Sequence, residues 1–135
     1  MIDPDAASFF QICGSCRRRW RSWNDFVLDP AVRLLGMQVQ TDRSDINLLV
    51  FEHDCGTSIS ILTRRLSGLL SDQDDAQPSV SLRDTERCKG HCRVLGDFAS
   101  CDAPCINARD RELMRLILRI QRHARAAEND ATQSA

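Results

Sequence analysis

Three consecutive segments in the first half of the chain carry the patterns of β-strands; they span residues 34–41, 46–53 and 57–62. In the first segment, Leu35, Met37 and Val39 alternate with small or polar residues, and this period of two predicts a half-buried strand. The second segment is rich in Ile, Leu, Val and Phe, and the third alternates again. Because the connections are short, the simplest topology is an antiparallel meander of three strands.

Two short helices are predicted beside these strands. Ser22 is followed three residues later by Asp25, the arrangement of a capping box, which predicts a helix that ends before Asp29-Pro30. Residues 63–70 predict another short helix, with Thr63 as its N-cap.

The strongest helix signal lies in residues 107–127. Apolar side chains recur there at helical spacing; they are Leu113, Met114, Leu116, Ile117, Ile120 and Ala124. Arginines form a second stripe, which we expect to face solvent; it comprises Arg111, Arg115, Arg119 and Arg122. The residues after 127 are polar and are expected to fray.

Together these elements predict an α+β fold in three parts. Residues 1–70 form the first unit, a small three-stranded antiparallel sheet with metal-binding knuckles. Residues 71–87 are polar and acidic, contain Pro78, and predict a linker. Residues 88–127 carry a cysteine cluster and the long helix. We expect a metal to staple this last segment, which packs on the first unit.

Composition limits the kind of protein and its compartment. The 135 residues are 42% apolar, enough for a modest core, and the seven cysteines suggest that something besides apolar burial stabilises it. A net charge of -1 gives no global preference for nucleic acid or membrane. The N-terminal MIDPDAASFFQICGSC lacks a basic start, and no segment has the length of a membrane span. We therefore expect a cytoplasmic protein, in which clustered cysteines are metal ligands rather than disulfides.

The first candidate metal site combines two short motifs. Cys13 and Cys16 form a C-x2-C pair, which can hold one side of a tetrahedral metal. His53 and Cys55 lie between the second and third predicted strands, and their spacing places both side chains on one side of a hairpin tip. Gly56 suits the positive φ that such a tip requires.

Two other interpretations of these motifs stay open at this point. Cys55 could be a buried core thiol, with His53 at the surface. Alternatively, the CGSC motif could be a thioredoxin-like redox pair, although the residues that follow it do not predict the long helix that such a motif precedes.

The arrangement C-x2-C…H-x-C-G resembles the knuckle pair of zinc ribbons and rubredoxin-like proteins over residues 11–60. It departs from their usual pattern because the second knuckle is H-x-C rather than C-x2-C, which makes His53 the uncertain ligand. In addition, W-x-D-F-x-x-D-P followed by F-x-H-x-C-G-T is similar to small uncharacterised bacterial cysteine-rich proteins, a resemblance that implies no function.

The second candidate metal site lies in residues 88–105, CKGHCRVLGDFASCDAPC. It contains two C-x3-C pairs; the four cysteines are Cys88, Cys92, Cys101 and Cys105. A c-type haem is excluded because His91 precedes Cys92 instead of following a C-x2-C pair. Four thiolates suit a structural zinc ion or an iron–sulfur cluster, with His91 either a ligand or a neighbour of the site.

The sequence favours binding over catalysis. It contains no glycine-rich phosphate loop, no G-x-S-x-G and no H-E-x-x-H. We therefore expect an accessory or regulatory protein with two structural zinc sites that acts by binding another protein. The alternative is an iron–sulfur electron-transfer or redox-sensing protein with its cluster at 88–105. A third possibility is a single-stranded nucleic-acid binder, through the Arg/Trp patch at residues 17–23.

Overall fold

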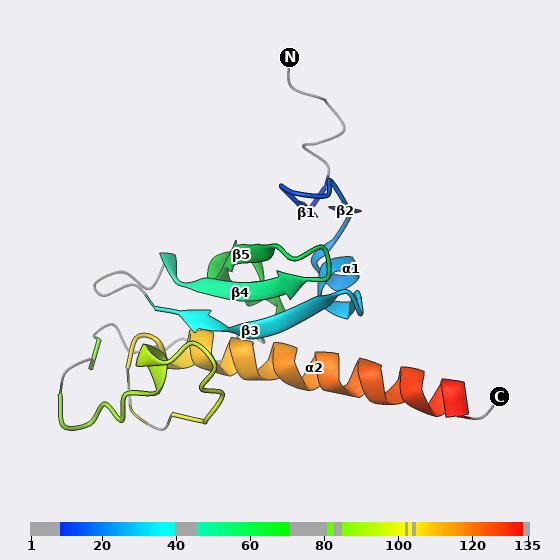
Figure 1. Cartoon of the computed structure of the whole chain (residues 1–135). Helices are drawn as coiled ribbons and strands as arrows, with labels where there is room; N and C mark the ends of the chain where they lie inside the picture. The colour runs from blue at the N-terminus through cyan, green and yellow to red at the C-terminus, as the bar shows by residue number, and fades with distance from the viewer. Residues whose placement is uncertain are drawn as a thin grey trace, which may run out of the picture.

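A computed structural model shows an antiparallel sheet of three strands packed against one long helix (Figure 1). It describes residues 9–39, 46–70, 81–82, 85–101, 103 and 105–133. The strands β3 (Val32–Gln38), β4 (Leu48–His53) and β5 (Ser58–Leu62) pair in sequence order. The long helix is α2 (Ala108–Gln133). The predicted α+β class and three-strand meander are confirmed, whereas most of the predicted linker at 71–87 lies outside the described residues.

The predicted face of the first strand is wrong in its first half. Val32 and Leu34 are buried, whereas Leu35, which we expected on the inner face, is half-buried. The cause is a bulge in the pairing of β3 with β4 between Leu34 and Gly36, because one extra residue reverses the faces that follow. After the bulge Met37 is buried and Gln38 exposed, as the alternation predicts.

Gly36 is the point at which the second cysteine segment lies on the sheet. A methyl group on its Cα would stand 1.5 Å from the carbonyl oxygen of Leu95, so no larger residue fits without displacing that backbone. We expect Gly36→Ala to lower the free energy of unfolding by about 1–3 kcal/mol in a denaturant titration. It should also raise amide exchange near Leu95. Gly68→Ala is the control, because its Cβ would meet nothing within 4 Å; equal effects of the two variants would contradict this packing.

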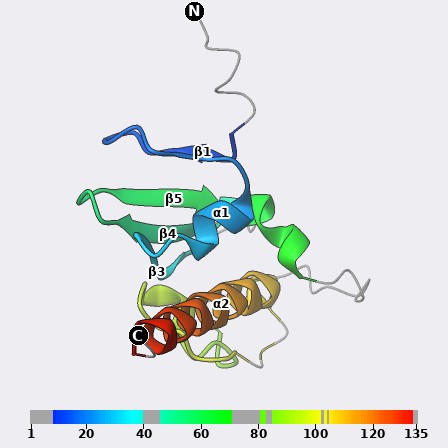
Figure 2. The same ribbon diagram turned by 90° about the vertical axis from the view of Figure 1, so that its right-hand side faces the viewer.

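A small hairpin and a short helix precede the sheet. The hairpin pairs β1 (Gln11–Ile12) with β2 (Arg19–Trp20), and the sequence analysis did not predict it. Helix α1 (Trp23–Leu28) begins as predicted, with the Ser22 hydroxyl accepting a hydrogen bond from the Asp25 amide at 3.2 Å. Figure 2 shows the hairpin on the side of the sheet away from α2, with α1 at the end of the strands. The hairpin therefore forms a separate layer on that side of the sheet.

The segment after β5, where one short helix was predicted, forms two 3-10 turns, η3 (Thr63–Arg65) and η4 (Ser67–Leu69). Thr63 does not cap a helix; its hydroxyl donates to Asp110 Oδ2 of α2 at 2.8 Å. The Asn47 side chain donates to the same oxygen at 2.9 Å. These bonds attach the ends of β4 and β5 to the first turn of α2.

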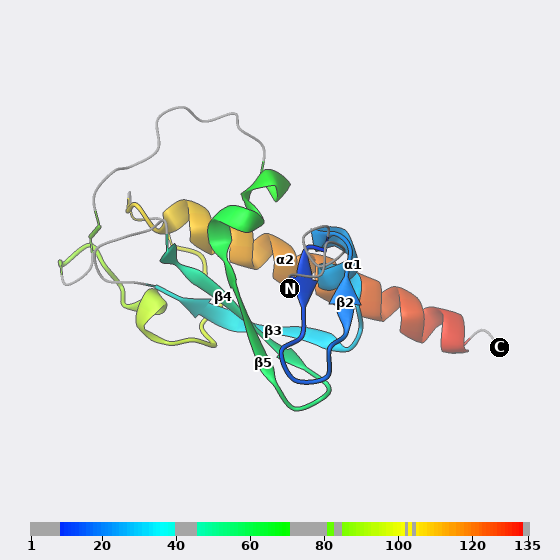
Figure 3. The same cartoon turned by 90° about the horizontal axis from the view of Figure 1, so that it is seen from above.

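Helix α2 is held by its predicted apolar face and by polar side chains that the sequence analysis did not assign. Leu113, Met114 and Ile117 are fully buried. Gln121, also buried, accepts from the Leu34 amide at 2.9 Å and donates to the carbonyl oxygen of Val27 at 3.0 Å. The helix extends to Gln133, beyond the end predicted at residue 127. Its C-terminal half extends past the edge of the sheet (Figures 1 and 3).

The expectation of a solvent-facing arginine stripe on α2 is wrong at its first member. Arg111 is only 1% exposed, whereas Arg115 is half-buried and Arg119 and Arg122 are exposed. Arg111 faces the cysteine segment at 88–101, where carbonyl groups accept its hydrogen bonds. In the described part of the chain, no helix combines the length and the apolar character needed to cross a membrane.

Candidate metal centre

The turn of the β1–β2 hairpin presents Cys13 and Cys16. The Cys13 amide donates to the Arg18 carbonyl at 2.8 Å, and the Arg17 amide donates to the Cys13 carbonyl at 3.1 Å. These two bonds close a tight turn, and Arg17 adopts a left-handed φ of 68° within it. Cys13 is completely buried, whereas Cys16 is exposed at the mouth of the turn.

The β4–β5 connection presents His53 and Cys55 from the opposite side. The His53 amide donates to the Thr57 carbonyl at 2.8 Å, and the Gly56 amide donates to the His53 carbonyl at 2.9 Å. Gly56 has a φ of 93°, which confirms the expected left-handed position after Cys55. The two turns are alike, since each places a residue of positive φ directly after a cysteine.

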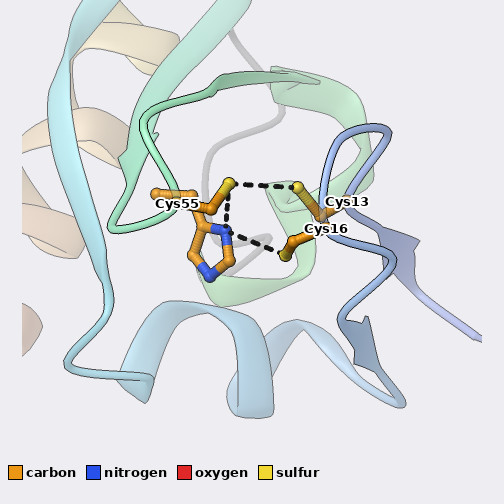
Figure 4. A group of neighbouring side chains, drawn as sticks. Cys13, Cys16 and Cys55 are labelled. Carbon is orange, nitrogen blue, oxygen red and sulfur yellow. Dashed lines mark hydrogen bonds between the residues drawn. The ribbon is translucent and has the colours of Figure 1, made fainter.

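The four predicted ligands of this first site meet at one place. The Sγ atoms of Cys13, Cys16 and Cys55 and a ring nitrogen of His53 all lie within 4.8 Å of one another. Cys13 Sγ is 3.7 Å from Cys55 Sγ, Cys16 Sγ is 3.7 Å from His53 Nδ1, and that nitrogen is 3.1 Å from Cys55 Sγ. In Figure 4 the three labelled sulfurs and the imidazole converge from the two turns. These residues could hold a metal ion.

The distances are close to those of a tetrahedral zinc site. Zn–S bonds of about 2.3 Å and Zn–N bonds of about 2.0–2.1 Å place neighbouring ligand atoms about 3.5–3.8 Å apart. The two separations of 3.7 Å agree with this geometry, and the third is shorter. Three thiolates with one imidazole are a common donor set of structural zinc sites.

The imidazole of His53 is oriented as a ligand through Nδ1. The ring is 2% exposed and lies edge-on to the Trp20 ring, with centroids 5.2 Å apart. Nε2 is buried without a hydrogen bond, but a carboxylate oxygen of Asp54 stands 3.3 Å away. The negative charge of this carboxylate favours the tautomer with its proton on Nε2, which would leave Nδ1 free for a metal. This role of Asp54 was not predicted, although its position in the sequence between His53 and Cys55 could have indicated it.

The hairpin turn favours the thiolate form of its inner cysteine. Hydrogen bonding from the Cys16 amide, supported by the Ser15 amide and opposed by burial, lowers the pKa of Cys13 from 9.0 to about 6. For Cys16, the Arg18 amide lowers the pKa, but partial desolvation by the surrounding atoms and the neighbouring Cys13 and Cys55 outweigh it, and the net direction is upward. One thiolate therefore forms easily, and crowding of negative charge opposes the next unless a cation is present.

Asp29 attaches the hairpin to α1 next to this site. Its Oδ2 accepts from Trp20 Nε1 and from Arg18 Nε, both at 2.8 Å, and its Oδ1 accepts from the Ala31 amide at 2.9 Å. Burial raises the pKa of the carboxyl, but the bonds from Trp20, Ala31 and Arg18 together bring it below 3.8. Asp29, which was predicted only to end the helix together with Pro30, thus also fixes the position of the Trp20 ring through this hydrogen bond.

A lowered pKa in the folded state predicts how Asp29 affects stability with pH. Its contribution is present above the unfolded value of about 3.9 and disappears as the pH falls through the lower folded value. We expect Asp29→Asn to cost about 1.5–3 kcal/mol at neutral pH and almost nothing once the wild-type carboxyl is protonated. Urea titrations of metal-free protein across acidic pH measure this. Glu86→Gln, which removes an exposed carboxylate from a turn outside the helices and strands, is the control, and a pH-independent deficit in Asp29→Asn would contradict the assignment.

The four cysteines of the second predicted site are brought to one region but not to one point. Cys88, Cys92, Cys101 and Cys105 are half-buried and line a cavity of about 30 Å³. Among the described residues, three or more ligand atoms within 4.8 Å of one another occur only at the first site. His91, also at this cavity, has its Nδ1 2.8 Å from Asp97 Oδ2, so this nitrogen is already engaged.

The Arg/Trp patch at 17–23 is divided between core and surface. Trp20 is 2% exposed and packs edge-on to Phe26, whereas Trp23 is 38% exposed. Arg18 pairs with Asp29, and the Arg19 guanidinium lies 5.3 Å from the centre of the Phe9 ring. Only one of the two indoles is therefore presented for stacking on a base.

Comparisons of the chain with models of protein families, with curated proteins and with solved structures find no match.

Proposed function

We propose that the protein is a small zinc-binding protein in which Cys13, Cys16, His53 and Cys55 hold a structural ion, and that it acts by binding another protein. One observation supports the structural role above all: the four ligand atoms, which lie within 4.8 Å of one another, account for all four positions of a tetrahedron. A catalytic zinc keeps one position for water or substrate. The ion would attach the β1–β2 hairpin to the tip of β4 and β5, and its binding free energy would become folding free energy.

Metal analysis of the purified protein tests the zinc assignment. We expect a colourless protein that contains zinc, and a Cys16→Ser variant that contains one equivalent less. Ser15→Ala, a neighbouring exposed side chain that is not a ligand, should retain the full amount. Iron bound at this site, or the same metal content in Cys16→Ser and wild type, would contradict the proposal.

A groove beside the metal site supports the choice of a protein partner. It has a volume of about 650 Å³ and is lined by both signs of charge, from Arg33, Glu52, Asp54 and Arg125. An open, charged surface of this kind suits the polar rim of a protein interface better than a small apolar substrate. Because His53 also lines the groove, the metal site would hold this surface in shape.

Site-specific photo-cross-linking in cells tests the groove. A photoreactive residue at position 125 should capture a discrete protein, whereas the same residue at position 119, exposed on another face of α2, should not. The capture at 125 should disappear in the Cys16→Ser background. Equal capture at both positions, or capture that persists without the ligand, would contradict a metal-supported interface.

A further inference from the structure

The cavity between the second cysteine segment and α2 is arranged around sulfur. Its walls come from the 3-10 turn η5 (His91–Arg93), the first turn of α2 and Val39 after β3. Four cysteines line it, and all of them are half-buried rather than free at the surface. These cysteines are separate from the first site in sequence and in structure, and none of them is a ligand of the proposed zinc ion at that site.

Hydrogen-bond donors point at two of the four sulfurs. The Leu82 amide donates to Cys105 Sγ at 3.3 Å, and Asn107 Nδ2 stands 3.9 Å from the same sulfur. Arg111 Nη1 lies 3.7 Å from Cys92 Sγ. A neutral thiol is a weak acceptor, whereas a metal-bound thiolate needs such donors to stabilise its charge. The donors therefore suit thiolates.

Arg111 provides buried positive charge at the same cavity. Its Nε donates to the Ala99 carbonyl at 2.6 Å, and its Nη2 donates to the Asp97 carbonyl at 2.6 Å and to Asp97 Oδ1 at 3.0 Å. Burial of a guanidinium is costly unless negative charge compensates it. Asp97 supplies one carboxylate, which His91 shares. A zinc ion bound by four thiolates is a net anion, and it would supply further compensation.

The cavity has room for a metal ion. Its volume is about 30 Å³, and a site that holds one water molecule needs about 10–15 Å³. Zinc requires sulfurs about 3.8 Å apart, and no three of these sulfurs are mutually within 4.8 Å. Metal binding must therefore draw the cysteines inward.

We propose that Cys88, Cys92, Cys101 and Cys105 form a second zinc site, which closes when the metal binds and fixes the segment from 88 to 105 on α2 and β3. This inference rests on the proposed zinc-binding function and adds to it a site that metal assembles. Binding would exchange the four thiol protons for one Zn²⁺, so that zinc uptake releases protons to the buffer.

Native mass spectrometry of the full chain titrated with Zn²⁺ tests the proposal. Wild type should bind two ions, and Cys16→Ser and Cys101→Ser should each bind one. Ser100→Ala, the neighbour of Cys101, should bind two. Cys88→Ser provides a second ligand variant should Cys101→Ser fold poorly, and it should also bind one.

Hydrogen exchange on the same proteins identifies which segment each ion orders. The second ion should slow amide exchange in residues 88–101 of wild type and Cys16→Ser but not of Cys101→Ser. If wild type binds one ion and only Cys16→Ser loses it, the second site is overturned and the proposed first site is supported. No ion in wild type would overturn both. Iron with inorganic sulfide bound by residues 88–105 would overturn the zinc assignment here.

Discussion

Replacing Cys16 by serine should lower the stability of the zinc-loaded protein by about 3 kcal/mol or more and leave the metal-free protein almost unchanged. The Cys16 side chain is exposed, so its replacement creates no cavity in the core. Its Sγ nevertheless lies 3.7 Å from His53 Nδ1, within the ligand group. Whatever stability is lost must therefore come from the metal and not from packing.

Guanidinium titrations of both proteins, with zinc and after chelation, measure this effect. Ser15→Ala is the matched control from the same turn and should behave as wild type in both conditions. Cys13→Ser is a less informative variant because Cys13 is completely buried, and its loss would mix packing with metal binding. An equal deficit of Cys16→Ser with and without zinc would show that the thiol acts without a metal.

Arg111→Ala is the second change from which we expect a large effect, a loss of about 3–5 kcal/mol. The side chain is 1% exposed and donates to the carbonyl groups of Ala99 and Asp97. Its removal would leave these acceptors unpaired beneath the cysteine segment and would open a void beside α2.

Comparison of three variants separates the effect of the lost hydrogen bonds and charge from the effect of the void. Arg111→Met retains most of the volume, so its deficit reports the lost hydrogen bonds and charge, and the further loss in Arg111→Ala reports the void. Arg119→Ala, on the exposed face of the same helix, should change stability by less than about 0.5 kcal/mol. If Arg111→Met were as stable as wild type, the bonds to Ala99 and Asp97 would contribute nothing.

Local patterns in the sequence predicted the sheet and the four candidate metal ligands of the first site because each depends on neighbouring residues. The His53-Asp54-Cys55-Gly56 tip follows from two strands that meet there, and C-x2-C fixes its own turn. By contrast, β1 and β2 have two residues each, too short to show a period in the sequence. Their pairing follows from the turn at Cys13–Cys16 instead.

The predictions from the sequence were wrong where the position of a residue depends on a contact with a residue far away in the chain. Arg111 belongs to a regular arginine stripe, and only the backbone of residues 97–99 makes its position an interior one. Thr63 is a residue type that often caps helices, but its hydroxyl donates a hydrogen bond to Asp110, which is distant in sequence. Gly36 gives no sign in the sequence that the Leu95 carbonyl will lie against it. Long-range contacts of this kind are not visible in a local pattern.

The central claim is that a metal ion holds the hairpin on the sheet; its ligands would be Cys13, Cys16, His53 and Cys55. Thermal unfolding before and after verified metal removal tests this claim most directly. The Cys101→Ser protein is the form to use, because it retains the first site alone. Removal of its single ion should lower the transition midpoint by about 10 °C or more. An unchanged midpoint, with metal analysis showing that the ion is gone, would contradict the structural role assigned to it.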